Sequence, residues 1–181
     1  MWKGWTESRP SGASRCHEAT IRSDVQLLRS LPGVVAVATV AQVPLSGAGS
    51  ANGYRAKNDP KAPLQAVNYF EGDENVVDAF GLRLVEGRKF RPEEIAFQSP
   101  GSSASAKQVI VSRAVATAMY GEGPVVGKLM YDMNGTAAEI VGVYELMMGS
   151  WVNSPEPKPA ETMLHPTVQP GPRARYAVRT R

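Results

Sequence analysis

The stretch AVNYFEGDENVVDAFGLRLVEGRKF, residues Ala66–Phe90, decides how we expect this chain to fold. It opens with an apolar segment and then places apolar side chains at helical spacing within 75–80. Gly81 follows directly, where a glycine ends a helix at little steric cost. Leu82 and Leu84 then alternate with other residues, as in a short strand. The stretch therefore predicts a strand, a helical turn and a second strand, without the features of an active site.

The side chains of this unit are expected to pack rather than to bind a ligand. Its larger apolar residues are predicted to join one layer of the protein to a helix: Phe70, Phe80, Leu82 and Leu84. Arg88 is predicted to bridge to Glu93 or Glu94 as a structural ion pair. These two glutamates are adjacent, so on a helix they would point about 100° apart and would not form a catalytic carboxylate pair.

The composition indicates a globular protein. The 181 residues suffice for one domain or two small lobes, and contents of 43% hydrophobic and 20% charged residues are near globular averages. The formal net charge is +3, but much of the basic excess lies near the C-terminus: Arg173, Arg175, Arg179 and Arg181. A nucleic-acid-binding protein more often spreads basic residues over a helix or interleaves them with aromatic residues. We therefore expect no nucleic-acid partner.

The sequence shows neither a disulfide pair nor a membrane segment. Cys16 is the only cysteine, so an internal disulfide is not possible. The longest strongly apolar run, residues 34–45, is interrupted by polar residues and a proline, and it is shorter than the roughly 20 residues of a membrane helix. The first residues lack the apolar region of a signal peptide. As given, the chain is predicted to be soluble, and a segment outside it would have to carry it out of the cytoplasm.

The N-terminal part predicts a leader, a helix and a strand. Residues 1–18 show no periodicity and are predicted to be a flexible leader. Within them, the tripeptide CHE at 16–18 has metal-binding residue types but no further ligands elsewhere, so no metal site is expected. A helix is predicted over 19–31, where apolar residues recur at helical spacing and Pro-Gly follows. β-branched residues then predict a strand over 34–43.

Two glycine-rich segments do not match a phosphate-binding loop. The first, SGAGSANG at 46–53, lacks a following helix start or a lysine at the required place, so we predict a polar loop there. The second, GEGPVVGK at 121–128, has Glu122 where the Walker pattern needs glycine and is followed by Leu129 where the pattern needs Ser or Thr. We expect no nucleotide and no other cofactor. Residues 54–64 are interpreted as a peripheral hairpin or excursion.

The second half predicts short strands around one helix. A strand is expected at 109–111, and Ser112 caps the short helix that follows it. The runs 128–133 and 136–144 are strand-like, and Asn134-Gly135 between them is a strong hairpin signal. The segment 98–106, before the first of these strands, is predicted to be a surface loop.

The last part of the chain is rich in proline. Residues 146–172 are predicted to form a wandering loop with one extended piece at 163–168. A last strand is expected at 176–180. Together, two helix–strand units surrounded by irregular excursions favour an α+β fold.

No catalytic, cofactor-binding or metal-binding residue is predicted. His165 stands between Leu164 and Pro166 without a second His, a Cys or a paired acid nearby in the sequence, and it is interpreted as structural. A hydrolase that uses Ser46 or Ser112 with His165 is a minor alternative. It is disfavoured because neither serine has the spacing of a nucleophile elbow.

Four pieces in this order resemble the MacB-like periplasmic core domain of ABC-transporter permeases, the family that also has the FtsX-like membrane part. They are LRSLPGVVAVAT at 28–39; NYF at 68–70 with FGLRLVEGR at 80–88; VIVSRAVA at 109–116 leading to GK at 127–128; and EIVGV at 139–143 with VRT at 178–180. Each piece alone is weak, but the ordered set is specific. The chain departs from the family at Ser112, where Asn is usual, and in residues 1–18, which replace an expected strand.

The resemblance, which covers residues 19–181, implies a fold and a location. The fold is two-lobed, with porter-like β-α-β units and a smaller mixed α/β insertion. Residues 19–181 would be the core domain and residues 1–18 a leader, with the membrane helices of the permease absent from this fragment. Such domains lie on the periplasmic side of the bacterial inner membrane, as part of an integral membrane permease.

The resemblance also implies a function without catalysis. The domain would couple ATP hydrolysis by a separate cytoplasmic ATPase subunit to a conformational change in the periplasm, in export or mechanotransmission. Expected partners are that ATPase, a second permease copy and a periplasmic adaptor protein. A free-standing extracytoplasmic module that binds a ligand or peptide between its lobes is the alternative. Membrane helices on both sides of this segment in the full reading frame would separate the two.

Overall fold

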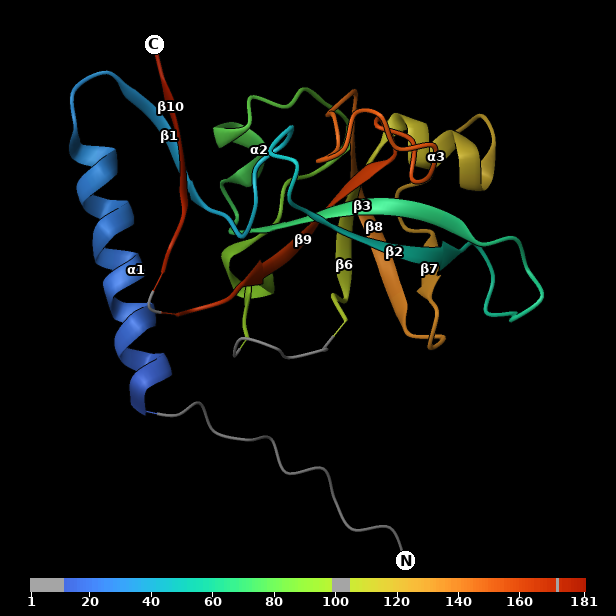
Figure 1. Cartoon of the computed structure of the whole chain (residues 1–181), viewed down its shortest axis with the longest axis horizontal. Coiled ribbons are helices and arrows are strands. Elements are labelled where there is room, and N and C mark those ends of the chain that lie inside the picture. Colours follow the sequence, from blue (N-terminus) through green and yellow to red (C-terminus); the bar gives the residue numbers. More distant parts are fainter. Residues whose placement is uncertain (1–11, 99–104, 172) are drawn as a thin grey trace, which may run out of the picture.

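The computed structural model describes residues 12–98, 105–171 and 173–181 (Figure 1). The elements are α1 (Gly12–Ser30), β1 (Val34–Thr39), β2 (Ser50–Arg55), β3 (Gln65–Gly72), α2 (Val76–Ala79), β4 (Leu84–Gly87), the 3-10 turn η1 (Pro92–Glu94), β5 (Ala96–Phe97), β6 (Gln108–Ser112), α3 (Arg113–Tyr120), β7 (Leu129–Asp132), β8 (Ala137–Tyr144), β9 (Thr162–Val168) and β10 (Tyr176–Thr180). The class is mixed α and β, which confirms the predicted α+β content.

Six strands of the described chain form a closed barrel. Strands β3, β2, β7, β8, β6 and β9 are neighbours in that order, and the pairing of β3 with β9 closes the ring. The β3–β9 and β6–β8 pairs are parallel, whereas β2–β3, β2–β7, β7–β8 and β6–β9 are antiparallel. The short strands β4 and β5 extend the sheet by pairing with β8 and β9.

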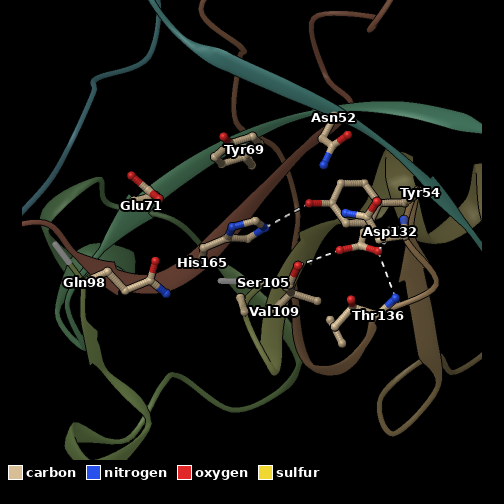
Figure 2. Close-up of a pocket in the computed structure, with 13 residues that line it drawn as sticks. Asn52, Tyr54, Tyr69, Glu71, Gln98, Ser105, Val109, Asp132, Thr136 and His165 are labelled. Carbon is tan, nitrogen blue, oxygen red and sulfur yellow. Dashed lines mark hydrogen bonds between the residues drawn. The ribbon is translucent and has the colours of Figure 1, made fainter. Parts of the chain in front are cut away.

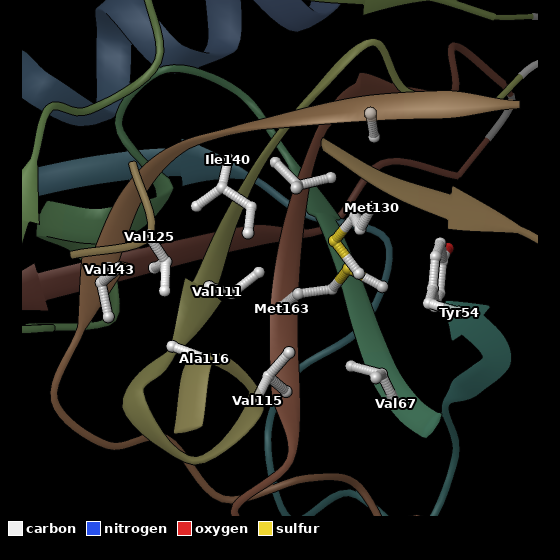
Figure 3. Close-up of a cluster of buried hydrophobic side chains, with 12 residues drawn as sticks. Tyr54, Val67, Val111, Val115, Ala116, Val125, Met130, Ile140, Val143 and Met163 are labelled. Atoms are coloured by element: carbon white, nitrogen blue, oxygen red, sulfur yellow. The ribbon is translucent and has the colours of Figure 1, made fainter. Parts of the chain in front are cut away.

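The interior of the barrel is filled by every second side chain of its strands, because successive side chains point to opposite faces. One end of the barrel interior is lined by polar and aromatic side chains (Figure 2). The rest is filled by apolar side chains, which we call the barrel core (Figure 3): Tyr54, Val67, Val109, Val111, Val115, Ala116, Val125, Met130, Ala138, Ile140, Val143 and Met163. Because Val115 and Ala116 belong to α3, this helix covers the end opposite the polar one.

A second layer lies against the outside of the barrel. Strands β1 and β10 pair antiparallel, with Val37 opposite Val178 and Ala38 opposite Ala177. Helix α1 lies beside this two-stranded sheet (Figure 1), and its Ile21 is 4% exposed. We call α1, β1 and β10 the outer layer.

The outer layer meets the barrel through a second group of buried apolar side chains. This outer core contains Ala38, Val40, Phe70, Val76, Val77, Phe90, Ile110, Val141, Tyr144, Met147 and Leu164. Phe80, Leu82 and Leu84 pack against it, and the rings of Phe70 and Phe80 meet edge to face at 6.4 Å. The expected packing role of these side chains is confirmed.

The strand, helical turn and strand predicted for residues 66–90 are β3, α2 and β4. Gly81 follows α2 with a φ of +67°, the left-handed conformation expected after a helix. The Asn134-Gly135 turn joins β7 to β8, and Ser112 caps α3 by accepting a hydrogen bond from the amide of Val115. Local signals therefore predicted these elements correctly.

Three predictions were wrong in their extent. Helix α1 begins at Gly12, so residues 12–18, which we assigned to the leader, belong to it; residues 1–11 lie outside the described part. The predicted polar loop at 46–53 ends earlier than expected, because β2 starts at Ser50. The strand predicted over 34–43 ends at Thr39, as β1. By contrast, the extended piece predicted at 163–168 is confirmed: it is β9, a fully buried barrel strand. Of the surface loop predicted over 98–106, residues 99–104 lie outside the described part.

The predicted ion pair of Arg88 is formed with Glu94. Two guanidinium nitrogens of Arg88 donate to the two carboxylate oxygens at 2.6 and 2.8 Å, and the backbone amide of Arg91 donates at 2.9 Å. The Arg88 hydrogen bonds lower the pKa of Glu94, against the opposing effect of partial burial. The pair joins the end of β4 to η1, so it is structural, as expected.

This geometry predicts a stability effect that depends on pH. The Glu94→Gln variant is expected to lower the free energy of unfolding by about 1 kcal/mol at pH 7, because the pair is charge-assisted but partly exposed. A lowered pKa in the folded state means that the carboxylate stabilises the fold above its unfolded pKa and loses this effect as the pH falls through the folded value. Urea unfolding should therefore show a difference between the variants that shrinks below about pH 4.5.

The matched control is Glu18→Gln, which removes the exposed i,i+4 pair between Arg22 and Glu18 on α1. Its effect should stay below about 0.5 kcal/mol at every pH. An equal loss in both variants, or a pH-independent loss at Glu94, would contradict the assigned role of the Arg88 pair.

Candidate functional site

The candidate site is the junction at which the outer layer meets the barrel. Past Thr39, the chain continues beside the end of β3 in an antiparallel manner. Val40 bridges Gly72, the amide of Ala41 donates to the carbonyl of Glu71 at 3.1 Å, and the Gln42 side chain donates to the Tyr69 carbonyl at 2.8 Å. One continuous segment therefore belongs first to the outer layer and then borders the barrel.

Asp73 connects the outer layer to the barrel at this junction. Its carboxylate accepts hydrogen bonds from the amides of Thr39 at 2.8 Å and Asn75 at 2.9 Å, so it joins β1 to the start of the segment that carries α2. The Asp73 amide in turn donates to the Thr39 carbonyl at 3.2 Å. Burial raises the pKa of Asp73, and the two amide donors counteract only part of this effect. Asp73 is a connecting residue that the sequence did not single out, because its partner lies 34 positions away.

A cleft separates α1 from the barrel beside this junction. A cavity of about 180 Å³ lies between Ile21 and Val25 of α1 and Ile95, Phe97 and Val168 of the barrel side. A larger hollow of about 850 Å³ adjoins it and shares Ile21, Thr39 and Val168 in its lining. Across the cleft, the guanidinium of Arg22 lies 4.8 Å from the centre of the Phe97 ring. The two sides of the cleft are thus in contact without filling the space between them.

The outer layer is attached to the barrel more strongly at the junction than across the cleft. The junction is held by backbone hydrogen bonds, the buried Asp73 and the outer core, whereas a partly exposed cation–π contact contributes only about 0.5–1 kcal/mol. Within the outer layer, the Tyr176 hydroxyl donates to Asp24 of α1 at 2.7 Å. The arrangement is that of a packed layer with a firm attachment at one edge and a weak contact at the other.

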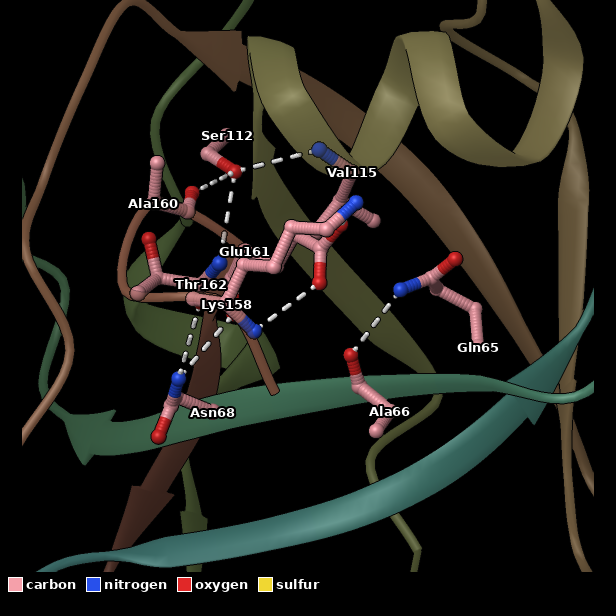
Figure 4. Close-up of polar contacts among 9 residues, drawn as sticks. All are labelled: Gln65, Ala66, Asn68, Ser112, Val115, Lys158, Ala160, Glu161 and Thr162. Carbon is pink, nitrogen blue, oxygen red and sulfur yellow. Dashed lines mark hydrogen bonds and ion pairs between the residues drawn. The ribbon is translucent and has the colours of Figure 1, made fainter. Parts of the chain in front are cut away.

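The residues of the disfavoured hydrolase are engaged elsewhere. The Ser112 hydroxyl donates to the carbonyl of Ala160 at 2.8 Å and accepts from the amides of Val115 and Thr162, both at 3.3 Å (Figure 4). Ser46 is exposed and donates to the carbonyl of Ala48. His165 is 9% exposed inside the barrel, where the Tyr54 hydroxyl lies 3.4 Å from Nε2. Neither serine is hydrogen-bonded to His165.

Two negative findings concern the described residues alone. Among them, no group of His, Cys, Asp or Glu is arranged to hold a metal ion. None of their helices combines the length and the apolar character needed to cross a membrane.

Comparison with solved structures shows a related fold. The extracellular domain of the noncanonic ABC-type transporter YknZ from Gram-positive bacteria aligns with a TM-score of 0.50 and 17% identity, over 80% of this chain and 60% of that one. The periplasmic region of MacB from Actinobacillus actinomycetemcomitans aligns with a TM-score of 0.50 and 16% identity, over 80% and 54%. The chain thus spans between half and two thirds of the length of these two domains.

Sequence comparison identifies the family. No curated protein sequence matches the chain. The sequence profile of the MacB-like periplasmic core domain matches residues 5–169, which is most of the 181 residues. This is the family suggested by the four ordered sequence pieces. The chain therefore belongs to the family of MacB-like periplasmic core domains found in ABC-transporter permeases.

Proposed function

We propose that this domain couples ATP hydrolysis by a cytoplasmic subunit to a conformational change on the extracytoplasmic side of the membrane. The proposal places the domain in a permease of the bacterial inner membrane. Its partners would be an ABC ATPase, a second permease copy and a periplasmic adaptor protein. The chain itself would perform no catalysis.

The junction is the observation that carries this proposal. A movement of α1 would reach β1 and β10 directly, because α1 packs on them, and it would reach the barrel through the Asp73 crossing and α2. The barrel is closed, and its strands share one core, so it is expected to move as a rigid body. The cleft supplies the space for such a movement, and the Arg22–Phe97 contact is weak enough to open and close.

The first test fixes the cleft. In a Cys16→Ser background, Arg22→Cys and Phe97→Cys are introduced into the permease and joined with a short bismaleimide. The activity is assayed in membranes that contain the permease and the ATPase subunit. Cross-linking is expected to abolish transport-dependent ATP hydrolysis, whereas the same variant without the cross-link is expected to keep this activity. The measurement is phosphate release before and after cross-linking, with the extent of linkage determined by mass spectrometry.

The matched control joins two positions within the outer layer, Asp24→Cys and Tyr176→Cys. These side chains are hydrogen-bonded in the structure and would move together, so their cross-link should leave ATP hydrolysis unchanged. Full activity with a complete Arg22–Phe97 cross-link would contradict coupling through this cleft. ATP binding by the isolated 181-residue chain would contradict the assignment of hydrolysis to a partner.

A further inference from the structure

The polar end of the barrel holds a cavity that the coupling function does not use. Its volume is about 230 Å³, and each of the six barrel strands contributes to its lining. Among the residues that line it are Asn52, Tyr54, Glu71, Asp132 and His165 (Figure 2). Mouths of β-barrels are frequent ligand sites. The volume is below the roughly 300–1,000 Å³ of sites for drug-sized ligands, so an occupant would be small.

The strand register explains why this end is polar. On β3, Val67 belongs to the barrel core, and the next two side chains on the same face are Tyr69 and Glu71. On β9, Met163 lies beside Tyr69 in the pairing, and His165 lies beside Glu71. The row of side chains that follows the apolar core is therefore aromatic and polar on both strands. A core that needed only to be filled would continue with apolar residues at these positions.

Aromatic rings form one wall of the cavity. The ring of Tyr69 stacks on His165 with centroids 4.7 Å apart and planes 10° from parallel. Tyr54 meets His165 edge-on, with its hydroxyl 3.4 Å from Nε2. Burial lowers the pKa of His165 to about 4, so the imidazole is neutral at pH 7. Among the described residues, Nδ1 of this ring has no hydrogen-bond partner, and the residue as a whole is 9% exposed.

The charges in the lining are negative but already engaged. Asp132 accepts hydrogen bonds from the Ser105 hydroxyl and from the amides of Asn134 and Thr136. Glu71 accepts from the Gln169 side chain at 2.9 Å, and burial raises its pKa. Among the described residues, neither lysine nor arginine lines the cavity. Anions are therefore disfavoured, and an ammonium group would have to compete with the hydrogen bonds that Asp132 and Glu71 already accept.

We infer that this cavity binds a small, neutral, polyhydroxylated molecule of the size of a single sugar ring. Its hydroxyl groups would exchange hydrogen bonds with the imidazole Nδ1 of His165 and with the Asn52 amide, whose side chain points toward the cavity in Figure 2. Its C–H face would pack on the tyrosine rings. A ligand of this size is expected to bind with a Kd of roughly 0.1–1 mM.

The test is a heteronuclear NMR titration of the 181-residue chain at pH 7 with four sugars of one ring size. D-glucose and N-acetylglucosamine are the neutral probes, and glucosamine and glucuronic acid carry a positive and a negative charge. At least one neutral probe is expected to give saturable shifts at residues lining the cavity. Glucuronic acid is expected to give none.

Two substitutions and one control locate the binding. His165→Phe keeps an aromatic ring but removes both nitrogens. Asn52→Ala removes the side-chain amide, while β2 keeps its backbone pairing with β3 and β7. Each is expected to weaken binding about fivefold, the effect of losing one hydrogen bond. Tyr131→Phe changes β7 outside the cavity lining and should leave the Kd unchanged. Should His165→Phe fail to fold, the Asn52→Ala titration alone decides the outcome.

Three outcomes would overturn the inference. The first is the absence of saturable shifts with both neutral probes. The second is binding that maps away from the cavity or is insensitive to Asn52→Ala. The third is binding of glucosamine more than tenfold tighter than glucose, which would make this a site for organic cations.

Discussion

Replacing Gly87 by alanine is expected to lower the free energy of unfolding by about 2–5 kcal/mol. Gly87 has a φ of +69°, which costs an L-residue about 1–2 kcal/mol. It also lies opposite Gly142 where β4 pairs with β8, and an added Cβ would collide with the carbonyl oxygen of Val141. Because this neighbour is backbone within a barrel strand, relief would require β4 to move away from β8.

The measurement is urea unfolding followed by circular dichroism, with Gly33→Ala as the matched control. Gly33 also has a positive φ, +83°, but an added Cβ there would have no neighbour within 4 Å. The control therefore isolates the backbone cost of about 1–2 kcal/mol from the steric cost. Equal losses at Gly87 and Gly33 would show that β4 does not lie as close to β8 as the structure places it.

Gly87 also illustrates what a single sequence can show. The alternation of Leu82 and Leu84 predicted a short strand at this place, and β4 confirms it. The paired Gly142, 55 positions later by number, gave no local signal that two glycines meet. Turns and helix ends depend on neighbouring residues, so α2, the Asn134-Gly135 hairpin and the Ser112 cap could be predicted. The close approach of two backbones depends on pairing and could not.

The same distinction explains why the start of β2 was missed. The composition of β2, SANGYR, favours a loop, and only its pairing with β3 and β7 makes it a strand. The strand β9 contains Pro166 within a proline-rich region, yet it pairs with β3 on one edge and with β6 and β5 on the other. Its extended conformation was predicted, but its pairing with these partners was not.

The two candidate sites could not be predicted from local sequence patterns for a related reason. The junction depends on Asp73 reaching Thr39, and the barrel cavity takes its lining from six strands spread along the chain. Neither Asn52 nor His165 is unusual within its own segment. Closure of the barrel by the parallel β3–β9 pair brings them to one end, and periodicity does not predict which strands will pair.

Ser112 offers the second large effect, because one hydroxyl group forms hydrogen bonds with three backbone groups, two of which are buried amides. The Ser112→Ala variant removes the cap of α3 and leaves the amides of Val115 and Thr162 and the carbonyl of Ala160 without this partner. Ser112 is 0% exposed, as are Val115 and Thr162, so water would not replace the hydrogen bonds that these two amides lose. Loss of a cap costs about 0.5–2 kcal/mol, and each unsatisfied buried group about 1–3 kcal/mol before relaxation.

We therefore expect Ser112→Ala to lower the free energy of unfolding by about 2–4 kcal/mol and Tm by about 4–16 °C. Ser46→Ala is the control, since its exposed hydroxyl bonds only within its own loop and its loss should change stability by less than about 0.5 kcal/mol. Calorimetry of both variants measures the difference. Because Ser112 joins β6 and α3 to the start of β9, its loss should also raise amide hydrogen exchange in β9 before global unfolding. A Ser112→Ala variant as stable as Ser46→Ala, with unchanged exchange in β9, would show that this hydroxyl does not hold the barrel closed at its α3 end.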